Sequence, residues 1–203
     1  MQFLASSQDT RLRLALEVMN LPYKMVTGFP GTAQLNKAMI QNEVNFTSSS
    51  LPGFTTQVLP QIVNTGIGVT LFQFPVIGPD GNPSGNPALE KAGMPPFDKF
   101  DREVFGKPPS GVKFDALLLV SDVGSKMQRG IFLPRGSPAE AVAALRQAFV
   151  GVAADPDFVA DYHKITGEDP DLVGADEIER IFDRIRKIAP DVKRVLKDSI
   201  AED

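Results

Sequence analysis

A turn with two glycines directly before an amphipathic helix is the pattern in this chain that could bind a ligand. The run from Lys24 to Val44 reads KMVTGFPGTAQLNKAMIQNEV. Residues 23–27 are rich in β-branched and aromatic types and predict a short strand, residues 28–31 supply a turn, and Thr32 predicts the N-cap of a helix. A helix that starts after a strand presents unpaired N–H groups and the positive end of its dipole. We therefore expect this segment to hold a carboxylate or phosphate without a charged side chain.

Three short segments follow predicted strands and together form the candidate ligand site. Open parallel sheets bind ligands at the carboxyl ends of their strands, so these segments are expected to converge. The candidate residues are Ser6, Ser7, Gln8, Asp9 and Thr10, then Gly31, Thr32 and Ala33, and then Ser48, Ser49 and Ser50. Asp9 also fits an ordinary helix cap, and the serine cluster also fits an ordinary polar loop, so both alternatives stay open.

Composition excludes several classes of protein. The chain has 203 residues, 42% of them apolar, which is enough for one buried core or two small ones. Its net charge is −4 and no part is strongly basic, so a nucleic-acid partner is not expected. Cysteine is absent, which excludes disulfides, thiol nucleophiles and Cys-ligated metals. No apolar run approaches the roughly 20 residues of a bilayer-spanning helix.

Residue types that support catalysis are sparse, and we expect no enzyme activity, cofactor or metal. His163 is the one histidine, and no Gly-x-Ser-x-Gly sequence offers it a nucleophile to activate. Acidic pairs such as Asp169 and Asp171 lack the spacing of an EF-hand. The glycines of GPDG at 78–81 lack the Lys-Ser/Thr of a phosphate-binding loop and fit a turn better.

Periodicity and turn residues predict alternating strands and helices in the first half and mainly helices after residue 133. Residues 77–96 are dense in Gly, Pro and Asn and predict a surface loop. Val142, Leu145, Phe149 and Val152 recur at core spacing in a helix capped by Ser137. Strands are expected at 2–5, 23–27, 44–47, 68–74 and 129–133, and helices at about 12–19, 32–40, 52–63, 97–105, 110–122, 138–152, 156–166, 175–188 and 190–199.

The sequence resembles the solute-binding proteins of tripartite tricarboxylate transporters. VTGFPGTAQLNKAMIQNEV is similar to that family's VTGY-x-G-(S/T)-A-E-(I/L)-N-L-A block, and RGIFLPRGSPAEAVAALRQAFVGVAADPDF is similar to its strand, turn and Ala-rich helix. The tail IAPDVKRVLKD resembles the closing helix. The resemblance covers nearly the whole chain and implies a periplasmic receptor that binds a small organic carboxylate and delivers it to a membrane permease.

The resemblance also implies a fold. We expect an α/β lobe of the type II periplasmic-binding-protein kind, with a parallel-rich sheet, over residues 1–128. Residues 129–203 would be C-terminal helices that return to a partial first lobe of this Venus flytrap. The family's amino-terminal part has no counterpart here, and MQFLA at the start is not a signal peptide. The chain is therefore expected to be a truncated or atypical member, or to begin inside a longer protein.

Two functions of different classes follow. The first is the carboxylate receptor, with the three segments as its site. The second is a shortened paralogue that no longer transports and acts as an oligomerisation or protein-interaction module. It is motivated by the missing cleft wall, by the absence of the family's glycine in residues 6–10, and by Asn45, Phe46 and Thr47 in place of the family's acidic, small and basic residues. Helix 142–152 would then expose apolar surface that needs a partner.

Overall fold

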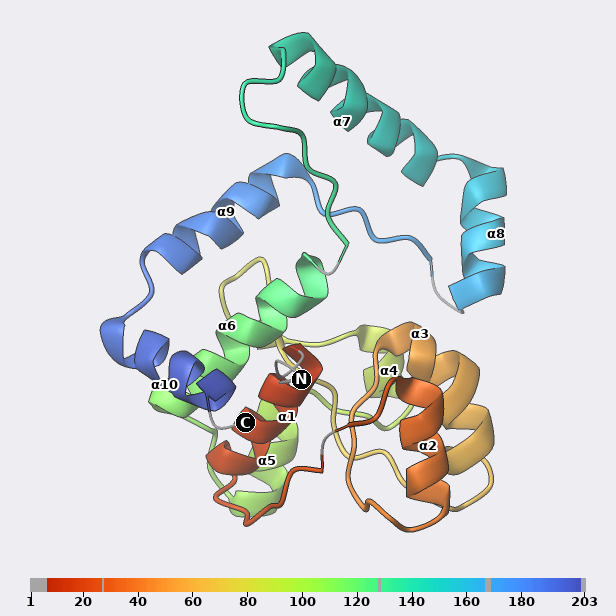
Figure 1. Ribbon diagram of the computed structural model, residues 1–203, viewed down its shortest axis with the longest axis vertical. Helices are drawn as coiled ribbons and strands as arrows, with labels where there is room; N and C mark the ends of the chain where they lie inside the picture. Colours follow the sequence, from red (N-terminus) through yellow and green to blue (C-terminus); the bar gives the residue numbers. More distant parts are fainter. Residues whose placement is uncertain (1–6, 27, 128, 167–168, 202–203) are drawn as a thin grey trace.

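A computed structural model describes residues 7–26, 28–127, 129–166 and 169–201 of the chain. Helices dominate these residues (Figure 1). The elements in order are α1 (Ser7–Val18), α2 (Thr32–Ile40), α3 (Leu51–Gly53), the π-helix η1 (Phe54–Val63), β1 (Val76–Ile77), β2 (Pro83–Ser84), α4 (Pro87–Lys91), α5 (Phe97–Phe105), α6 (Val112–Lys126), α7 (Ala139–Ala153), α8 (Pro156–Thr166), α9 (Ala175–Arg186) and α10 (Pro190–Ala201).

The expected α/β fold with a parallel-rich sheet is wrong. The chain is 58% helix and 3% strand. The sheet in the described residues has two strands, β1 and β2, which pair antiparallel with Val76 opposite Ser84. Of the strands expected from the sequence, the described parts of 23–27, 44–47, 68–74 and 129–133 are not strands, and 2–5 lies outside the described residues. The receptor-lobe architecture that the resemblance implied is therefore not the architecture of this structure.

Gln73 shows why the apolar run at 68–74 does not become a strand. Its N–H donates to the carbonyl of Pro95 at 2.9 Å, and its own carbonyl accepts from the N–H of Phe97 at 3.0 Å. Its side-chain amide donates to the carbonyls of Asn86 and Met94. The two backbone bonds form an isolated parallel bridge between Gln73 and Pro96. The bridge does not extend into a strand because Pro95 and Pro96 have no N–H to donate and α5 begins at Phe97.

The core lies where α1, α6 and α10 pack together. Leu14 and Ala15 of α1 and Leu117 of α6 are fully buried there. Polar residues of α1 are buried as well: Arg13 donates to the carbonyl of Ser199 at 2.8 Å, and the guanidinium of Arg11 lies 5.0 Å from the ring centre of Phe74. Because α10 comes from the end of the chain, this core joins both ends of the sequence. The expected boundary between two lobes after residue 128 stays a prediction.

An aromatic cluster extends the core toward α5. The ring of Phe72 lies 5.0 Å from that of Phe97 and 5.2 Å from that of Phe100. Phe97 has no exposed surface and also stacks on Phe114 of α6, with ring centres 6.3 Å apart. Aromatic contacts of this kind contribute beyond the area they bury, so they hold the extended segment before β1 against α5 and α6.

The helices expected from periodicity are confirmed. α5 and α8 have the expected bounds, and α6, α9 and α10 differ from expectation by a few residues at their ends. The expected cap of α7 is wrong: Pro138 occupies the N-cap position, and the hydroxyl of Ser137 donates to the carbonyl of Pro134 at 2.8 Å. Among the described helices, none combines the length and apolarity needed to cross a bilayer.

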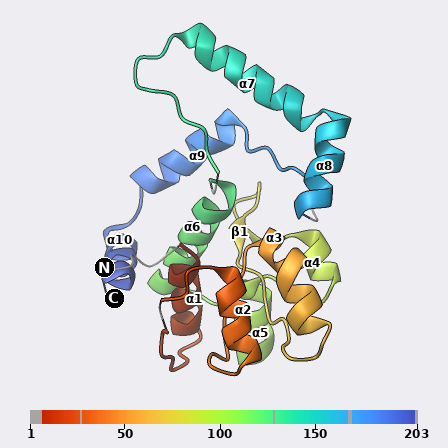
Figure 2. The same cartoon turned by 45° about the vertical axis from the view of Figure 1, so that its right-hand side comes forward.

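α7 and α8 lie apart from the body that contains α1–α6, as both views show (Figures 1 and 2). No residue of α7 is buried. The expectation that its apolar positions form a core is wrong, since Leu145, Phe149 and Val152 are exposed and Val142 is half-buried. The apolar surface expected on this helix is present, and no described residue covers it.

Candidate functional site

The starts of two helices come together at one end of the body. α2 and the continuous α3–η1 helix run side by side in the same direction, with their amino-terminal ends at the same end in both views (Figures 1 and 2). Gly31, Thr32 and Ala33 form the first of these ends, and Ser48, Ser49 and Ser50 lead into the second. The structure therefore brings together two of the three candidate segments.

Gly53 marks the contact between the two helix starts. A Cβ atom added to it would lie 2.7 Å from Ser49 Oγ, 3.2 Å from Ser50 Oγ and 3.7 Å from the Thr32 methyl group. The first distance is too short for any side chain, so only glycine fits here without a shift. The hydroxyl of Ser50 already caps α3, because it accepts from the N–H of Gly53 at 3.3 Å. Ser49 Oγ is buried and has no hydrogen-bond partner.

The first turn of α2 has no side-chain cap. Gly31 is the N-cap residue, in an extended conformation, so the expected capping role of Thr32 is wrong by one position. The carbonyl of Gly31 accepts from the N–H of Leu35 at 3.2 Å, which begins the helical ladder. Gly31 and Ala33 are exposed and Thr32 is half-buried. The first residues of α2 therefore keep part of their surface exposed.

The remaining candidate segment lies on another helix. Ser7, Gln8, Asp9 and Thr10 form the first turn of α1, while Ser6 lies outside the described residues. α1 packs against α6 and α10, whereas α2 packs against η1. Thr10 is buried. The structure thus gives this segment a place in the packing of α1 and does not pair it with the other two segments.

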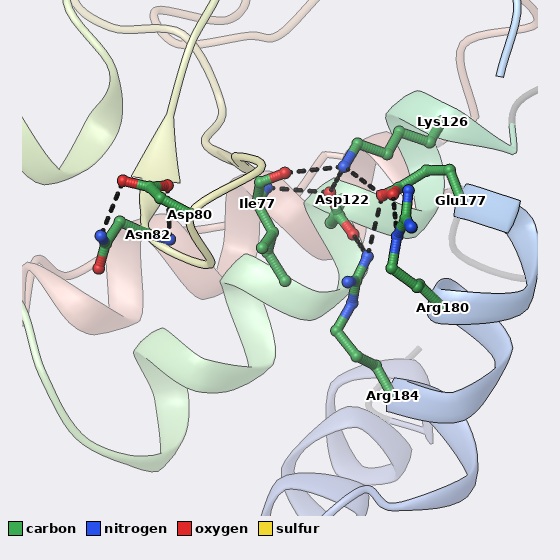
Figure 3. Close-up of polar contacts among 8 residues, drawn as sticks. All are labelled: Ile77, Asp80, Asn82, Asp122, Lys126, Glu177, Arg180 and Arg184. Atoms are coloured by element: carbon green, nitrogen blue, oxygen red, sulfur yellow. Dashed lines mark hydrogen bonds and ion pairs between the residues drawn. The ribbon is translucent and has the colours of Figure 1, made fainter. Parts of the chain in front are cut away.

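A cluster of charged residues, which sequence reasoning missed, joins α9 to α6 and β1 (Figure 3). Asp122 has no exposed surface and accepts from the N–H of Ile77 at 2.9 Å, from Lys126 at 2.9 Å and from Arg184 at 2.6 Å. Glu177 accepts from Lys126 at 2.9 Å and from Arg180 at 2.7 Å. Glu177, Arg180 and Arg184 share one face of α9 at helical spacing, which is the signal that could have revealed half of the cluster.

The cluster favours the charged forms of Glu177 and Lys126. Hydrogen bonds from Lys126 and Arg180 lower the pKa of Glu177 to about 2. Burial disfavours the charge on Lys126, but its hydrogen bonds to Glu177 and Asp122 outweigh that effect and raise its pKa. Each acidic group thus has at least two cationic partners.

Other arrangements with chemical potential are incomplete. Nδ1 of His163 lies 3.0 Å from an oxygen of Asp169, with both side chains more than half exposed. No serine of the described residues is hydrogen-bonded to this imidazole. No three His, Cys, Asp or Glu side chains gather in the described part of the chain in a way that could hold a metal ion.

Comparison with family models, with curated proteins and with solved structures finds no match. The resemblance to tricarboxylate-transporter receptors therefore remains a prediction from the sequence.

Proposed function

We propose that this chain binds a small organic carboxylate, without transforming it, at the joint start of α2 and α3–η1. The observation that carries the proposal is the closeness of the Thr32 methyl group to Gly53, which follows the Ser49–Ser50 segment, so that two helix starts meet there. The carboxylate would accept hydrogen bonds from the amides of Thr32 and Ala33, and from the hydroxyl of Thr32.

The electrostatics of this arrangement suit an anion. A helix carries roughly half a positive charge at its amino-terminal end, and two helices that start side by side add their fields. No side chain caps α2, so its first N–H groups keep their capacity to donate. Backbone amides and hydroxyls bind a carboxylate without the tight pairing of an arginine, which favours release and tolerance of different acids.

A role in transport rests on the sequence resemblance. In that reading the chain is the solute-binding component of a tripartite tricarboxylate-type system, located in the periplasm and recognised by a membrane permease. The carboxylate site proposed here would be the part of that role that resides in this chain.

The test is a titration followed residue by residue. The ¹⁵N-labelled protein is titrated with a panel of mono-, di- and tricarboxylates, with sodium chloride as the ionic control. A binding acid is expected to shift the amide signals of Gly31, Thr32 and Ala33 in a saturable way. Thr32→Pro removes one amide at the first helical position, where proline is tolerated, and is expected to weaken binding about tenfold. Thr32→Val separates the loss of the hydroxyl from the loss of the amide.

The matched control is Ala139→Pro, the same change at the first position of α7. It is expected to leave the affinity unchanged. The proposal fails if no acid of the panel shifts the three amides, or if Thr32→Pro binds as tightly as the unmodified chain.

The second candidate function, an oligomerisation module, is favoured by the exposed apolar surface of α7 and α8. Phe149 and Val150 of α7 and Phe158 and Ile165 of α8 keep a large part of their surface exposed. We name a second copy of the chain as the occupant, because a two-fold pair buries the same surface on both copies.

A further inference from the structure

A cavity of about 570 Å³ lies between the β1–β2 hairpin and the charged cluster. One wall is apolar and comes from Val76, Ile77 and Pro79 of the hairpin. The facing wall carries Lys126 from α6 and Glu177, Arg180 and Arg184 from α9, whose side chains converge in Figure 3. Its volume falls in the usual range of small-molecule sites, roughly 300 to 1,000 Å³.

Positive charge exceeds negative charge by one at this cavity. Lys126, Arg180 and Arg184 line it, and the acidic groups that face them are Glu177 in the wall and Asp122 directly behind it. The acidic group of the hairpin turn, Asp80, does not line the cavity and instead accepts from the backbone and side chain of Asn82.

The two arginines have donors to spare. A guanidinium has five N–H groups. Arg180 donates through Nε to Glu177, and its side chain is 64% exposed. Arg184 donates through one terminal nitrogen to Asp122 and Glu177, while its Nε is buried with no acceptor. This Nε has no surface that a ligand could reach, so the donors available to a ligand are terminal N–H groups of the two guanidinium groups.

We propose that this cavity binds a small organic anion with a single negative charge and an apolar body. Its charged group would take the unused guanidinium donors of Arg180 and Arg184 and neutralise the excess cation. Its apolar body would rest on Val76, Ile77 and Pro79. The site is separate from the start of α2 and α3–η1 and does not depend on the function proposed there.

The test uses sodium benzoate against benzamide, which has the same shape without the charge, and against sodium phosphate, which has charge without an apolar body. In ¹⁵N spectra of the full chain, benzoate is expected to shift the amides of Gly78 and Gly81 and the Nε–H signal of Arg180 in a saturable way. Benzamide and phosphate are expected to bind at least tenfold more weakly.

Two variants on α9 provide the decisive comparison. Arg180→Gln removes a cavity cation, whereas Arg186→Gln removes an arginine that is 63% exposed and paired with Asp183 three residues away, away from the cavity. Arg180 has the same kind of pair with Glu177, three residues away, and Arg186 also lies 5.9 Å from the ring centre of Phe182. Arg180→Gln is expected to weaken benzoate binding about fivefold, and Arg186→Gln to leave it unchanged.

Equal affinities in the two variants, or equal binding of benzoate and benzamide, would overturn the proposal. Shifts confined to the amides of Thr32 and Ala33 would also overturn it, while supporting the carboxylate site at α2. Conversely, Thr32→Pro is expected to leave the shifts of Gly78 and Gly81 intact, so the two sites succeed or fail separately.

Discussion

Asp122 holds three parts of the chain together through one carboxylate. It is fully buried and accepts from the backbone of β1, from Lys126 of its own helix and from Arg184 of α9. Asp122→Ala would remove the acceptor of the Ile77 N–H and would leave Glu177 as the one remaining carboxylate, among the described residues, that pairs with Lys126 and Arg184. We expect a loss of about 3 kcal/mol in the free energy of unfolding, the low end for a broken buried pair because both cations are partly exposed.

The measurement is urea unfolding at neutral pH, with Asp183→Ala as the control. Asp183 forms an ion pair with Arg186 on the surface of α9, and its side chain is 56% exposed. Its removal is expected to cost less than about 0.5 kcal/mol. Equal costs would mean that the buried cluster contributes no more than a surface pair.

Glu177 links the stability of the folded chain to pH. Its pKa is lowered from 4.5 to about 2 by Lys126 and Arg180, so the folded state binds this proton more weakly than the unfolded state. Its contribution to stability is complete above pH 4.5 and is lost as pH falls toward 2. We expect the stability advantage of the unmodified chain over Glu177→Gln to shrink across that window, as measured by urea unfolding at a series of pH values.

Glu179→Gln serves as the control for this pH dependence. Glu179 lies on the same helix, is exposed and forms no ion pair within the described part of the chain. The pH dependence of the Glu177→Gln difference is measured against this variant. A Glu177→Gln difference that does not change with pH would show that its carboxylate is not held by the two cations.

Among the candidate site residues, only those at a helix start that turn residues mark in the sequence could be predicted correctly. The helix start at Gly31–Ala33 follows from turn residues next to an apolar period, and the structure has it within one residue. The closeness of Thr32 to Gly53 depends on how two helices pack, and no local signal encodes it. Asp122 and Glu177 are 55 positions apart in the sequence, so their meeting could not be read from spacing either.

At the scale of elements, helices were predictable and strands were not. A helix makes its hydrogen bonds within its own segment, so the period of α5, α8 or α9 is a sufficient signal. A strand needs a partner from elsewhere. The apolar runs at 68–74 and 129–133 have strand-like composition, yet the first is held by Phe72 and Gln73 against α5 and its preceding loop, and the second leads to α7 without a partner strand.

Phenylalanines on α5 and α7 allow the packing of these two helices to be compared. Phe97→Ala removes a ring with no exposed surface and is expected to cost about 4 kcal/mol. Phe149 is 38% exposed on a helix with no buried residue, so Phe149→Ala is expected to cost less than about 1 kcal/mol. Both are measured by urea unfolding at low micromolar protein. A cost for Phe149 that approaches that of Phe97 would mean that α7 is covered in solution.

At the scale of the whole molecule, the chain divides into a body and an extended pair of helices. The body has a core to which α1, α6 and α10 contribute, and α9 is joined to it by the charged cluster. α7 and α8 contact each other. Apolar side chains that face water on two adjacent helices are the usual sign of a surface that another protein covers.

Self-association through α7 and α8 is therefore the prediction that belongs to the whole molecule. Sedimentation equilibrium from about 1 to 100 µM is expected to show a rise from monomer to dimer, since the buried apolar surface supplies the driving force. Phe149→Glu would place a charge in that surface and is expected to keep the chain monomeric throughout the range. Val104→Glu is the matched control, because Val104 is also an exposed apolar residue but lies on α5 in the body. A chain that stays monomeric at the highest concentration would exclude a second copy as the occupant of this surface, and dimerisation that survives Phe149→Glu would place the contact on another face.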